Sequence, residues 1–479
     1  MNYKAVFNII GKALMIEAVL LTLPMMVGVI YSENNLMAFL IPALIALGIG
    51  TPLTLIKSKE KDMYVKEGFV AVALVWIIMS LIGALPFAIS GEIPNYIDAF
   101  FETVSGFTTT GASILSDVEV LSRDIMFWRL FTHWIGGMGV LVFVLAIVPE
   151  HDSGIMHVFR AESPGPTVGK LVSKLSRTAR ILYGIYMAMT VIEVLLLLFG
   201  GNSFYDSLLL SFTTAGTGGF GIKNTGATDY SLYTQMVLAV FMFLFGVNFN
   251  FYYLVLIRCV GKAFKMEEVR WYFVIVLVST LAVAINLISE TVNFIDALPL
   301  AFFQVASISS TTGITSANFD KWPAFSQAIL ITLTVIGSCG GSTGGGIKVA
   351  RLGIFAKTTA ADFRRLIHPR SVSYAKFDGE VVSTETEKNV KAYFLLWVAI
   401  VVISTILLSL DFNDVFSNFS ATLACIGNVG PGFSAVGPTM NYGFYSPVSK
   451  CLLSFVMLIG RLEIFPVLVL FAPRTWKRL

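Results

Sequence analysis

Residues 98–113 read DAFFETVSGFTTTGAS, and this stretch decides the fold. A mostly apolar segment of about ten residues follows Asp98, a residue type that often caps the N-terminus of a helix. The segment ends in a turn rich in threonine and glycine. A transmembrane helix needs about 20 apolar residues, so this segment is too short to cross a bilayer. We therefore expect a half-helix that enters the membrane and turns back, which requires that it be buried in protein or line a water-filled cavity.

The same layout occurs three more times along the chain. Each copy begins with aspartate, continues through a short apolar segment and ends in a glycine-containing turn: 206–221 (DSLLLSFTTAGTGGFG), 296–315 (DALPLAFFQVASISSTTGIT) and 414–433 (DVFSNFSATLACIGNVGPGF). A single turn of this kind is better explained as an extracellular loop. Four in the same position of four units predict four pore loops around one pathway, in pseudo-symmetric repeats.

The composition is that of a membrane protein. Of the 479 residues, 56% are hydrophobic and only 13% are charged, whereas soluble domains carry about 25% charged residues. Apolar runs at 13–31, 37–55 and 68–90 are long enough to span a bilayer. The first run is too long for the apolar region of a signal peptide, so we expect it to be retained as a span. The sequence predicts an all-α polytopic membrane protein with about ten transmembrane helices.

These helices divide into two N-terminal spans and four helix–pore loop–helix repeats. The predicted boundaries are 1–66 for the N-terminal pair and 67–150, 151–260, 261–375 and 376–479 for the repeats.

Lysine and arginine are concentrated on alternate connections. The basic connections hold Lys57, Lys59, Lys61 and Lys66; Arg160, Lys170, Lys174, Arg177 and Arg180; Arg258, Lys262, Lys265 and Arg270; Lys357, Arg364, Arg365, Arg370, Lys376, Lys388 and Lys391; and Arg474, Lys477 and Arg478. The other connections hold only Arg123, Lys223, Lys321 and Lys450. Positively charged loops stay on the cytoplasmic side, so both termini are predicted to be cytoplasmic. Contact of these loops with anionic lipid would not alter that topology.

The turns favour a cation held by backbone carbonyls. The C-terminal end of a helix carries partial negative charge, so four half-helix ends aimed at one axis attract a cation. The turns contain no Asp or Glu, whose rings would suggest Ca²⁺ or non-selective passage. Glu102 and Asp117 flank only the first turn. Each turn has a glycine that can adopt unusual backbone angles, at Gly111, Gly218, Gly313 and Gly430. Neighbouring threonines could add hydroxyl ligands or brace the turn.

Several other classes of function find no support. The cysteines Cys259, Cys339, Cys425 and Cys451 have no paired spacing, and the four histidines are scattered, so neither a disulfide framework nor a zinc site is indicated. No dinucleotide fingerprint or Walker motif occurs. Paired carboxylates and an activated nucleophile are also lacking, so a membrane enzyme or scaffold is disfavoured. We expect no cofactor in this chain and no nucleic-acid partner.

At its turns the chain resembles the superfamily of K⁺ transporters that includes TrkH, KtrB and plant HKT proteins. The resemblance rests on GFTTTGAS, GTGGF, SSTTGIT and NVGPGF, with HWIGGMG, IGSCGGSTGGGIK and LIGRLEIFP in the second spans. Two spans before the first repeat make it similar to the TrkH type. The resemblance implies a K⁺ filter centred on Thr110–Gly111, Thr217–Gly218, Thr312–Gly313 and Val429–Gly430, with filter residues Thr109, Thr110, Gly111, Gly216, Thr217, Gly218, Thr311, Thr312, Gly313, Asn428, Val429 and Gly430. Glycine in all four turns fits the K⁺-selective branch.

A second feature is the stretch 337–348, GSCGGSTGGGIK, inside an apolar span. Each glycine costs a helix about 1 kcal/mol, so we expect this span to be broken. A tight helix-packing surface of small residues is the alternative. The resemblance implies an intramembrane gating loop beneath the filter, formed by Gly340, Gly341, Ser342, Thr343, Gly344, Gly345 and Gly346.

Arg461 lies deep in the final span, where an arginine is costly and points to function. Pairing with Glu463, or capping of carbonyls of the broken span, is the alternative to a functional role. By resemblance, Arg461 lies under the filter beside the loop, where its charge opposes cation passage. Lys348 is expected to extend toward the inner surface, and no role is assigned to Arg129.

Together these features predict a subunit of a potassium uptake channel or transporter, with K⁺ as the transported ion. The resemblance implies a bacterial cytoplasmic (inner) membrane and a homodimer with one pore in each protomer. It also implies a cytoplasmic regulator with RCK domains, resembling TrkA, that binds ATP or NAD(H) and docks on the basic loops within 351–391. The alternative is a K⁺ symporter coupled to H⁺ or Na⁺, for which Glu102 is the obvious buried ionisable candidate.

Overall fold

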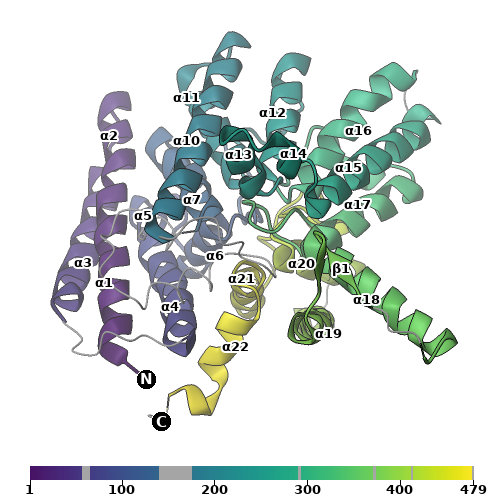
Figure 1. Cartoon of the computed structure of the whole chain (residues 1–479). Coiled ribbons are helices and arrows are strands. Elements are labelled where there is room, and N and C mark those ends of the chain that lie inside the picture. Colours follow the sequence, from purple (N-terminus) through teal and green to yellow (C-terminus); the bar gives the residue numbers. More distant parts are fainter. Residues whose placement is uncertain (57–64, 140–174, 290–292, 371–373, 412–413, 477–479) are drawn as a thin grey trace.

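Helices make up most of the part of the chain that the structure describes (Figure 1). The computed structural model describes residues 1–56, 65–139, 175–289, 293–370, 374–411 and 414–476. Within these residues, six helices are long and apolar enough to cross a membrane, or seven if one sharply bent pair counts as a span. The strands form a small antiparallel hairpin, β1 (Lys376–Phe377) and β2 (Glu380–Val381). The predicted all-α polytopic fold is therefore confirmed.

Some sequence predictions fall outside the described residues. They include the boundary at 150/151 and the basic residues Lys57, Lys59, Lys61, Arg160, Lys170, Lys174, Lys477 and Arg478.

Two spans precede the first repeat, as predicted. α1 (Tyr3–Leu20) and α2 (Thr22–Tyr31) together form one span, and α3 (Leu36–Leu55) forms the other. The step between α1 and α2 lies close to Pro24, which has no N–H to donate to the carbonyl of the preceding turn. α1 packs closely on α3, because a Cβ on Gly11 would lie only 2.8 Å from the carbonyl oxygen of Gly50. Glycine thus permits this helix contact.

Each repeat contains a first span, a pore helix and a second span. The first spans are α4 (Val65–Gly83) continued by α5 (Leu85–Ser90), α10 (Leu175–Phe199), α15 (Glu267–Asn286) and α19 (Thr384–Leu408). The pore helices are α6 (Tyr96–Phe107), α11 (Phe204–Gly216), α16 (Phe294–Ser309) and α20 (Val415–Ile426). The second spans are α7 (Arg123–Gly137), α12 (Leu232–Phe245), α17 (Ala324–Ile336) and α21 (Pro447–Arg461).

Shorter elements continue these helices. α13 (Phe249–Leu256) and α14 (Val260–Ala263) follow α12, α18 (Val349–Ile367) follows α17, and α22 (Phe465–Phe471) follows α21. The 3₁₀ turns are η1 (Leu287–Ser289), η2 (Phe319–Lys321), η3 (Ser409–Asp411), η4 (Ser434–Val436) and η5 (Pro473–Thr475).

The pore helices have 12, 13, 16 and 12 residues, so none can cross a bilayer at 1.5 Å per residue. Their starts correct the sequence analysis, which took the aspartate of each stretch as the N-cap. The N-cap is an aspartate only in α20, at Asp414. In the other three the N-caps are Asn95, Ser203 and Asn293. Asp98, Asp206 and Asp296 follow three residues later, in the first turn, where a carboxylate favours the positive end of the helix dipole.

All four second spans stop early. α7, α12, α17 and α21 have only 13 to 15 residues. α12 and α13 meet at 90° across Gly246–Asn248. α17 ends before Gly337, and α18 begins only at Val349, so the break predicted at 337–348 is confirmed. The sequence analysis did not predict the break between α12 and α13.

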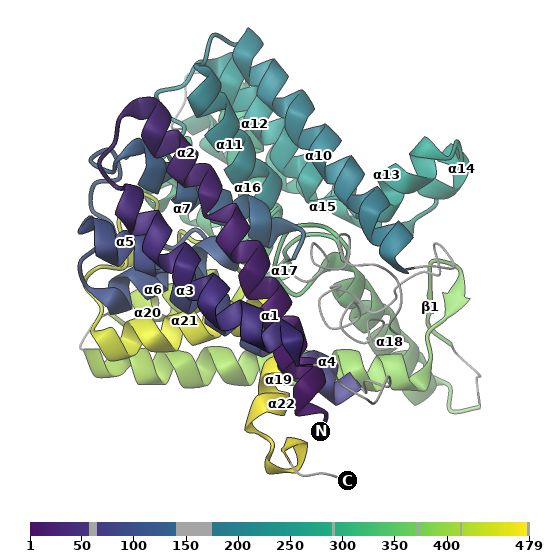
Figure 2. The same cartoon turned by 90° about the vertical axis from the view of Figure 1, so that its left-hand side faces the viewer.

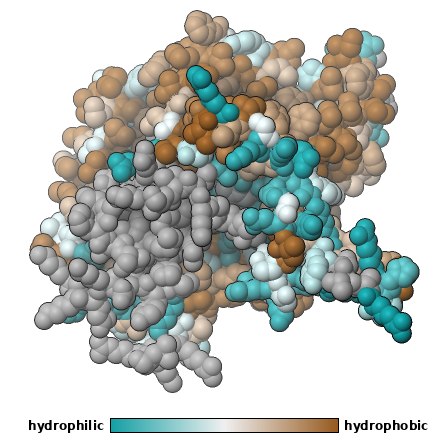
Figure 3. Space-filling view, viewed as in Figure 1, coloured by the Kyte–Doolittle hydropathy of each residue, from teal (hydrophilic) through white to brown (hydrophobic). Residues whose placement is uncertain are grey.

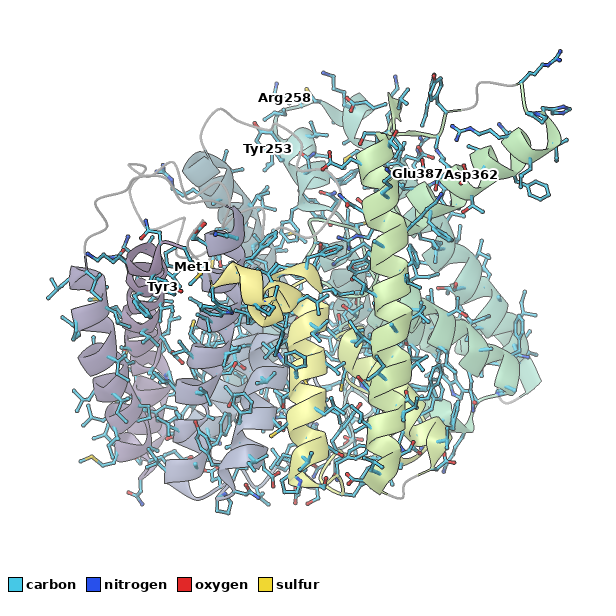
Figure 4. The ribbon with its side chains drawn as sticks, turned by 90° about the horizontal axis from the view of Figure 1, so that it is seen from below. Met1, Tyr3, Tyr253, Arg258, Asp362 and Glu387 are labelled. Carbon is cyan, nitrogen blue, oxygen red and sulfur yellow. The ribbon has the colours of Figure 1, made fainter. Side chains whose placement is uncertain are left out.

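The two termini lie at the same end of the helix bundle (Figures 1 and 2). The hydroxyl of Tyr3 donates to the backbone oxygen of Trp476 at 2.9 Å, which ties the two termini together. We call this the terminal end, and the opposite end, where the pore helices begin, the pore-helix end. Figure 4 places Arg258, Asp362 and Glu387 at the terminal end as well. Hydrophilic side chains gather over α14, β1 and α18, whereas hydrophobic side chains cover the spans α12, α15 and α16 (Figure 3).

Candidate ion pathway

The four turns after the pore helices share one backbone conformation. The middle residue of each turn donates its N–H to a carbonyl five residues earlier at 2.8 to 2.9 Å, in the pairs Thr110–Ser105, Gly218–Thr213, Thr312–Ser307 and Val429–Ala424. The residue before each has a left-handed backbone: Thr109 (φ 54°), Thr217 (53°), Thr311 (61°) and Asn428 (51°). The residue after each is a left-handed glycine: Gly111 (80°), Gly219 (89°), Gly313 (81°) and Gly430 (92°). For a β-branched threonine this conformation is strained, and such strain clusters at functional sites.

This register corrects the assignment of the second turn. The sequence analysis paired Gly218 with Gly111, but the left-handed glycine of the second turn is Gly219. Gly218 instead takes the middle place that Thr110 holds in the first turn. The imidazole of His133 explains why this middle place holds a glycine, since a Cβ on Gly218 would lie 2.1 Å from its Cγ. The ring of His133 thus fills the space that a side chain would need.

The turns close into a ring, each contacting the middle residue of the next. A Cβ built on each left-handed glycine would lie too close to the carbonyl oxygen of that middle residue. The distances from this Cβ to the oxygen are 2.2 Å for Gly111 and Gly218, 2.1 Å for Gly219 and Thr312, 1.9 Å for Gly313 and Val429, and 2.5 Å for Gly430 and Thr110. The fourth turn thus returns to the first. Any side chain at these glycines would displace a carbonyl of the neighbouring turn, so glycine is required at each.

The hydroxyls of the turns act mainly as braces. Thr110 shares a hydrogen bond with Thr108 at 2.8 Å, and Thr312 shares one with Ser310 at 2.7 Å. The side-chain amide of Asn428 donates to the Thr110 hydroxyl at 2.9 Å and to the Met457 carbonyl at 3.0 Å. Asn428 therefore joins the fourth turn to the first.

A buried ion pair lies behind the first and second turns. Arg129 Nε donates to Glu102 Oε1 at 2.7 Å, and both side chains are at most 2% exposed. The guanidinium also donates to the Gly221 carbonyl at 3.1 Å and lies over the Phe220 ring at 3.7 Å from its centroid. The other oxygen of Glu102 accepts the N–H of Ile114 at 3.0 Å. The pair thus ties together the two strands of chain that leave these turns.

Removing one partner of this pair should damage both stability and selectivity. Glu102→Gln leaves the Arg129 charge buried without its partner, which costs about 3–5 kcal/mol. We expect a lower unfolding temperature in detergent and weaker discrimination between K⁺ and Na⁺ in liposome flux. Asp98→Asn is the matched control. Asp98 lies on the same pore helix as Glu102 and forms an ion pair at 2.6 Å, with Lys450 of α21. Equal selectivity in both variants would contradict a positioning role for Glu102.

Asp117 follows the first turn on the exposed surface. Its carboxylate accepts the Asn224 side-chain amide at 2.7 Å and the Glu119 N–H at 2.9 Å. These two hydrogen bonds hold the pKa of Asp117 below its usual range. The carboxylate therefore stays charged at neutral pH and joins the connections of repeats 1 and 2.

The glycine-rich loop between α17 and α18 lies against the ring of turns. A Cβ on Gly344 would lie 2.4 Å from the Ser310 carbonyl oxygen, and a Cβ on Gly345 would lie 2.4 Å from that of Gly427. The N–H of Gly345 donates to the Thr311 hydroxyl at 2.6 Å. Of the predicted gate residues within the loop, only Gly341 is exposed, whereas Gly340 and Ser342 to Gly346 are buried.

Arg461 connects this loop to repeat 1. Its Nη1 donates to the Thr343 carbonyl at 2.6 Å, and its Nη2 donates to the carbonyls of Gly136 and Gly137 at 2.5 and 2.6 Å. Arg461 therefore caps the C-terminal carbonyls of α7 and holds the loop at the same time. Glu463, the alternative partner, forms an ion pair with Arg351.

Lys348 differs from its prediction. It is only 3% exposed and donates to the Gly344 carbonyl, so it closes the loop and does not extend toward the inner surface.

Comparison with known proteins agrees with this arrangement. A sequence model of the TrkH family, described as a cation transport protein, matches residues 35–478. The chain is 34% identical to the Trk system potassium uptake protein TrkH of Salmonella typhimurium over 487 residues, which covers 100% of both chains. It is 30% identical to TrkG of Escherichia coli K12 over 464 residues, covering 95% of this chain and 94% of the other.

The chain belongs to the TrkH family. The crystal structure of the potassium transporter TrkH from Vibrio parahaemolyticus matches it with a TM-score of 0.90 at 29% identity and covers 100% of both chains. The resemblance to this superfamily and the multi-pass membrane architecture are thus confirmed. The family is one of cation transporters and not of enzymes.

Some residues of this TrkH-family chain were missed by sequence reasoning. Glu268 at the start of α15 accepts the N–H groups of Gly340 and Ala350 at 2.5 and 3.1 Å, so it clamps both sides of the glycine-rich loop. In sequence, Glu268 is simply an acid in a first turn. His133 accepts the N–H of Phe220 at 3.2 Å and hydrogen-bonds the Gly106 carbonyl at 2.8 Å, joining repeats 1 and 2. The motif HWIGGMG was its only signal.

Proposed function

We propose that this chain is the K⁺-conducting subunit of a potassium uptake system. The observation that carries the proposal is the closed ring of four turns, in which each left-handed glycine contacts the middle carbonyl of the next turn. Rings of backbone carbonyls that replace a hydration shell are the basis of K⁺ filters. The names of the relatives, which are potassium uptake proteins, support K⁺ as the ion.

In this mechanism a K⁺ ion sheds water at the ring and is coordinated by carbonyls of the four turns. The filter residues are those predicted, with Gly219 replacing Gly218 as the glycine of the second turn. The C-terminal ends of the four pore helices add partial negative charge near the ion. The ion then meets the loop at 340–346, which blocks its way until the loop moves. The positive charge of Arg461 opposes the cation in this closed state.

The decisive experiment is cation flux through the purified full-length chain in liposomes. We expect uptake of K⁺ and Rb⁺ down their gradients, with Na⁺ flux at least about tenfold lower, a difference of 1.4 kcal/mol. Equal Na⁺ and K⁺ flux would refute the carbonyl filter. A reversal potential that follows the K⁺ gradient alone would identify a channel.

The proposal extends to topology and partners. We infer that the terminal end is cytoplasmic, because positively charged connections stay inside and basic residues such as Arg258 lie at this end (Figure 4). The bacterial relatives support the further proposal that the membrane is the bacterial inner membrane. The proposed assembly is a homodimer with a regulator carrying RCK domains, as in TrkA, and binding ATP or NAD(H). The proposed docking region around 351–391 is held in place by ion pairs: Lys357 pairs with Glu267, and Lys391 contacts Asp362 and Glu387 at 2.8 and 2.7 Å.

A K⁺ symporter remains the second candidate, and one observation favours it. Glu17 of α1 is completely buried, and within the described part of the chain its carboxyl oxygens have no hydrogen-bond partner. It lies where Gly83 meets Thr103 and Phe107 of the first pore helix. A carboxyl in this position could carry a proton. K⁺-driven proton uptake that disappears in Glu17→Gln would support coupling, and its absence in the wild type would exclude H⁺ symport.

A further inference from the structure

A cavity of about 590 Å³ opens at the pore-helix end, away from the ring of turns. It lies where α2, α7 and α11 meet the connections that follow the first two turns. The end of α2 touches α11 here, because the rings of Tyr31 and Tyr205 lie 5.5 Å apart, edge to face. The Tyr205 hydroxyl also donates to the Arg123 carbonyl at 2.5 Å, which fixes the start of α7. The cavity therefore has a firmly held wall.

The lining carries two positive and two negative side chains: Arg123, Lys223, Glu119 and Asp206. In the part of the chain that the structure describes, none of these four forms an ion pair. The two cations lie over aromatic rings, Arg123 over Tyr31 at 4.3 Å and Lys223 over Tyr230 at 4.5 Å. Among the described residues, Glu119 accepts a hydrogen bond only from the backbone N–H of Asn224, at 3.0 Å. Both signs of charge are thus available to a bound molecule.

The remaining lining and the surroundings favour an amphiphile. Leu121, Met126 and Ile222 give the cavity apolar walls, and Phe204, which is 64% exposed, also lines it. The neighbouring helix surfaces are apolar and exposed, with Ile30 of α2 at 71% and Phe199 of α10 at 84%. In a membrane-spanning chain such surfaces face acyl chains, and tyrosines at the end of a span lie at headgroup level.

We propose that this cavity binds the headgroup of a zwitterionic phospholipid. Arg123 and Lys223 contact its phosphate, and Glu119 and Asp206 accept hydrogen bonds from its ammonium group. The acyl chains follow the exposed faces of α2 and α10. An anionic lipid matches only half of these charges, because the two carboxylates would repel it. A free zwitterion offers the same charges but leaves the apolar walls unused.

The test is native mass spectrometry of delipidated full-length protein with added lipid. We expect phosphatidylethanolamine to bind about tenfold more tightly than phosphatidylglycerol, a difference of 1.4 kcal/mol. The double variant Arg123→Gln/Lys223→Gln should lose this binding. Glu119→Gln/Asp206→Asn should weaken the binding of phosphatidylethanolamine and strengthen the binding of phosphatidylglycerol. A general loss of structure would not change the two affinities in opposite directions. Arg365→Gln/Asp362→Asn, an exposed pair at the terminal end, is the matched control.

Three outcomes would overturn the assignment. The first is equal affinity of the wild type for the two lipids. The second is unchanged lipid binding in both cavity variants. The third is binding of soluble glycerophosphoethanolamine as tight as that of the intact lipid, which would assign the cavity to a free zwitterion.

Discussion

Gly219→Ala is expected to reduce K⁺ over Na⁺ discrimination at least about tenfold, which corresponds to 1.4 kcal/mol. Two effects act together. Gly219 has a left-handed backbone with φ 89°, which costs a residue with a Cβ about 1–2 kcal/mol. The new Cβ would also lie 2.1 Å from the Thr312 carbonyl oxygen, so this oxygen must move away from its place in the ring. The measurement is Rb⁺ and Na⁺ flux through purified protein in liposomes.

Gly218 provides the control that tests the register. Its backbone is not left-handed, and the three atoms nearest to a Cβ on Gly218 all belong to the His133 ring. Shortening the histidine should therefore make room for this Cβ. We expect His133→Ala/Gly218→Ala to select ions as His133→Ala alone does, whereas His133→Ala/Gly219→Ala loses selectivity. If the two double variants lost K⁺ over Na⁺ selectivity to the same extent, the register of the second turn would be wrong.

The sequence predicted the repeats but not this register, for a physical reason. Short apolar segments and glycine-containing turns are local features, so periodicity and length suffice to find them. The second turn contains Gly216, Gly218 and Gly219, and the Thr-Gly pattern favoured Gly218. The ring of His133 from the preceding repeat explains why residue 218 is also a glycine, and only the folded chain brings about this contact.

The pairing of buried charges also depends on contacts that the sequence alone does not reveal. Glu102 and Arg129 were visible in the sequence, but nothing local indicates that residues 27 positions apart pair behind the turns. The sequence analysis took Asp98, Asp206 and Asp296 as N-caps, but each lies three residues after the N-cap, in the first turn of its helix. Asn95, Ser203 and Asn293 are residue types that cap equally well, so the sequence alone did not distinguish them from the aspartates. The break between α12 and α13 has a single glycine, and a contact from outside the repeat supports it: Phe249 N–H donates to the Gly341 carbonyl at 3.0 Å.

Arg461→Ala is expected to raise basal K⁺ flux about tenfold or more in the absence of any regulator. Arg461 is the link between the Thr343 carbonyl of the loop and the α7 carbonyls of Gly136 and Gly137. A hydrogen bond from a charged group contributes about 1.5–3 kcal/mol, so losing the one to Thr343 shifts the closed loop toward the open state. Removing the charge also removes repulsion of the cation. Arg461→Lys keeps the positive charge but lacks the guanidinium that reaches the loop and α7 at once. It should therefore raise basal flux less than Arg461→Ala does.

Gly344→Ala distinguishes the effect of the loop's position on basal flux from the effect of the Arg461 charge. Its backbone is not left-handed, and the added Cβ would lie 2.4 Å from the Ser310 carbonyl oxygen and from the Ser338 hydroxyl oxygen. The substitution should therefore push the loop away from the ring and raise basal flux while Arg461 stays in place. Gly184→Ala is the matched control, since no atom of the described residues, apart from the nearby backbone of α10 itself, lies within 4 Å of a Cβ at Gly184. Wild-type flux in both Arg461→Ala and Gly344→Ala, at normal expression, would mean that the loop at 340–346 does not gate the pathway.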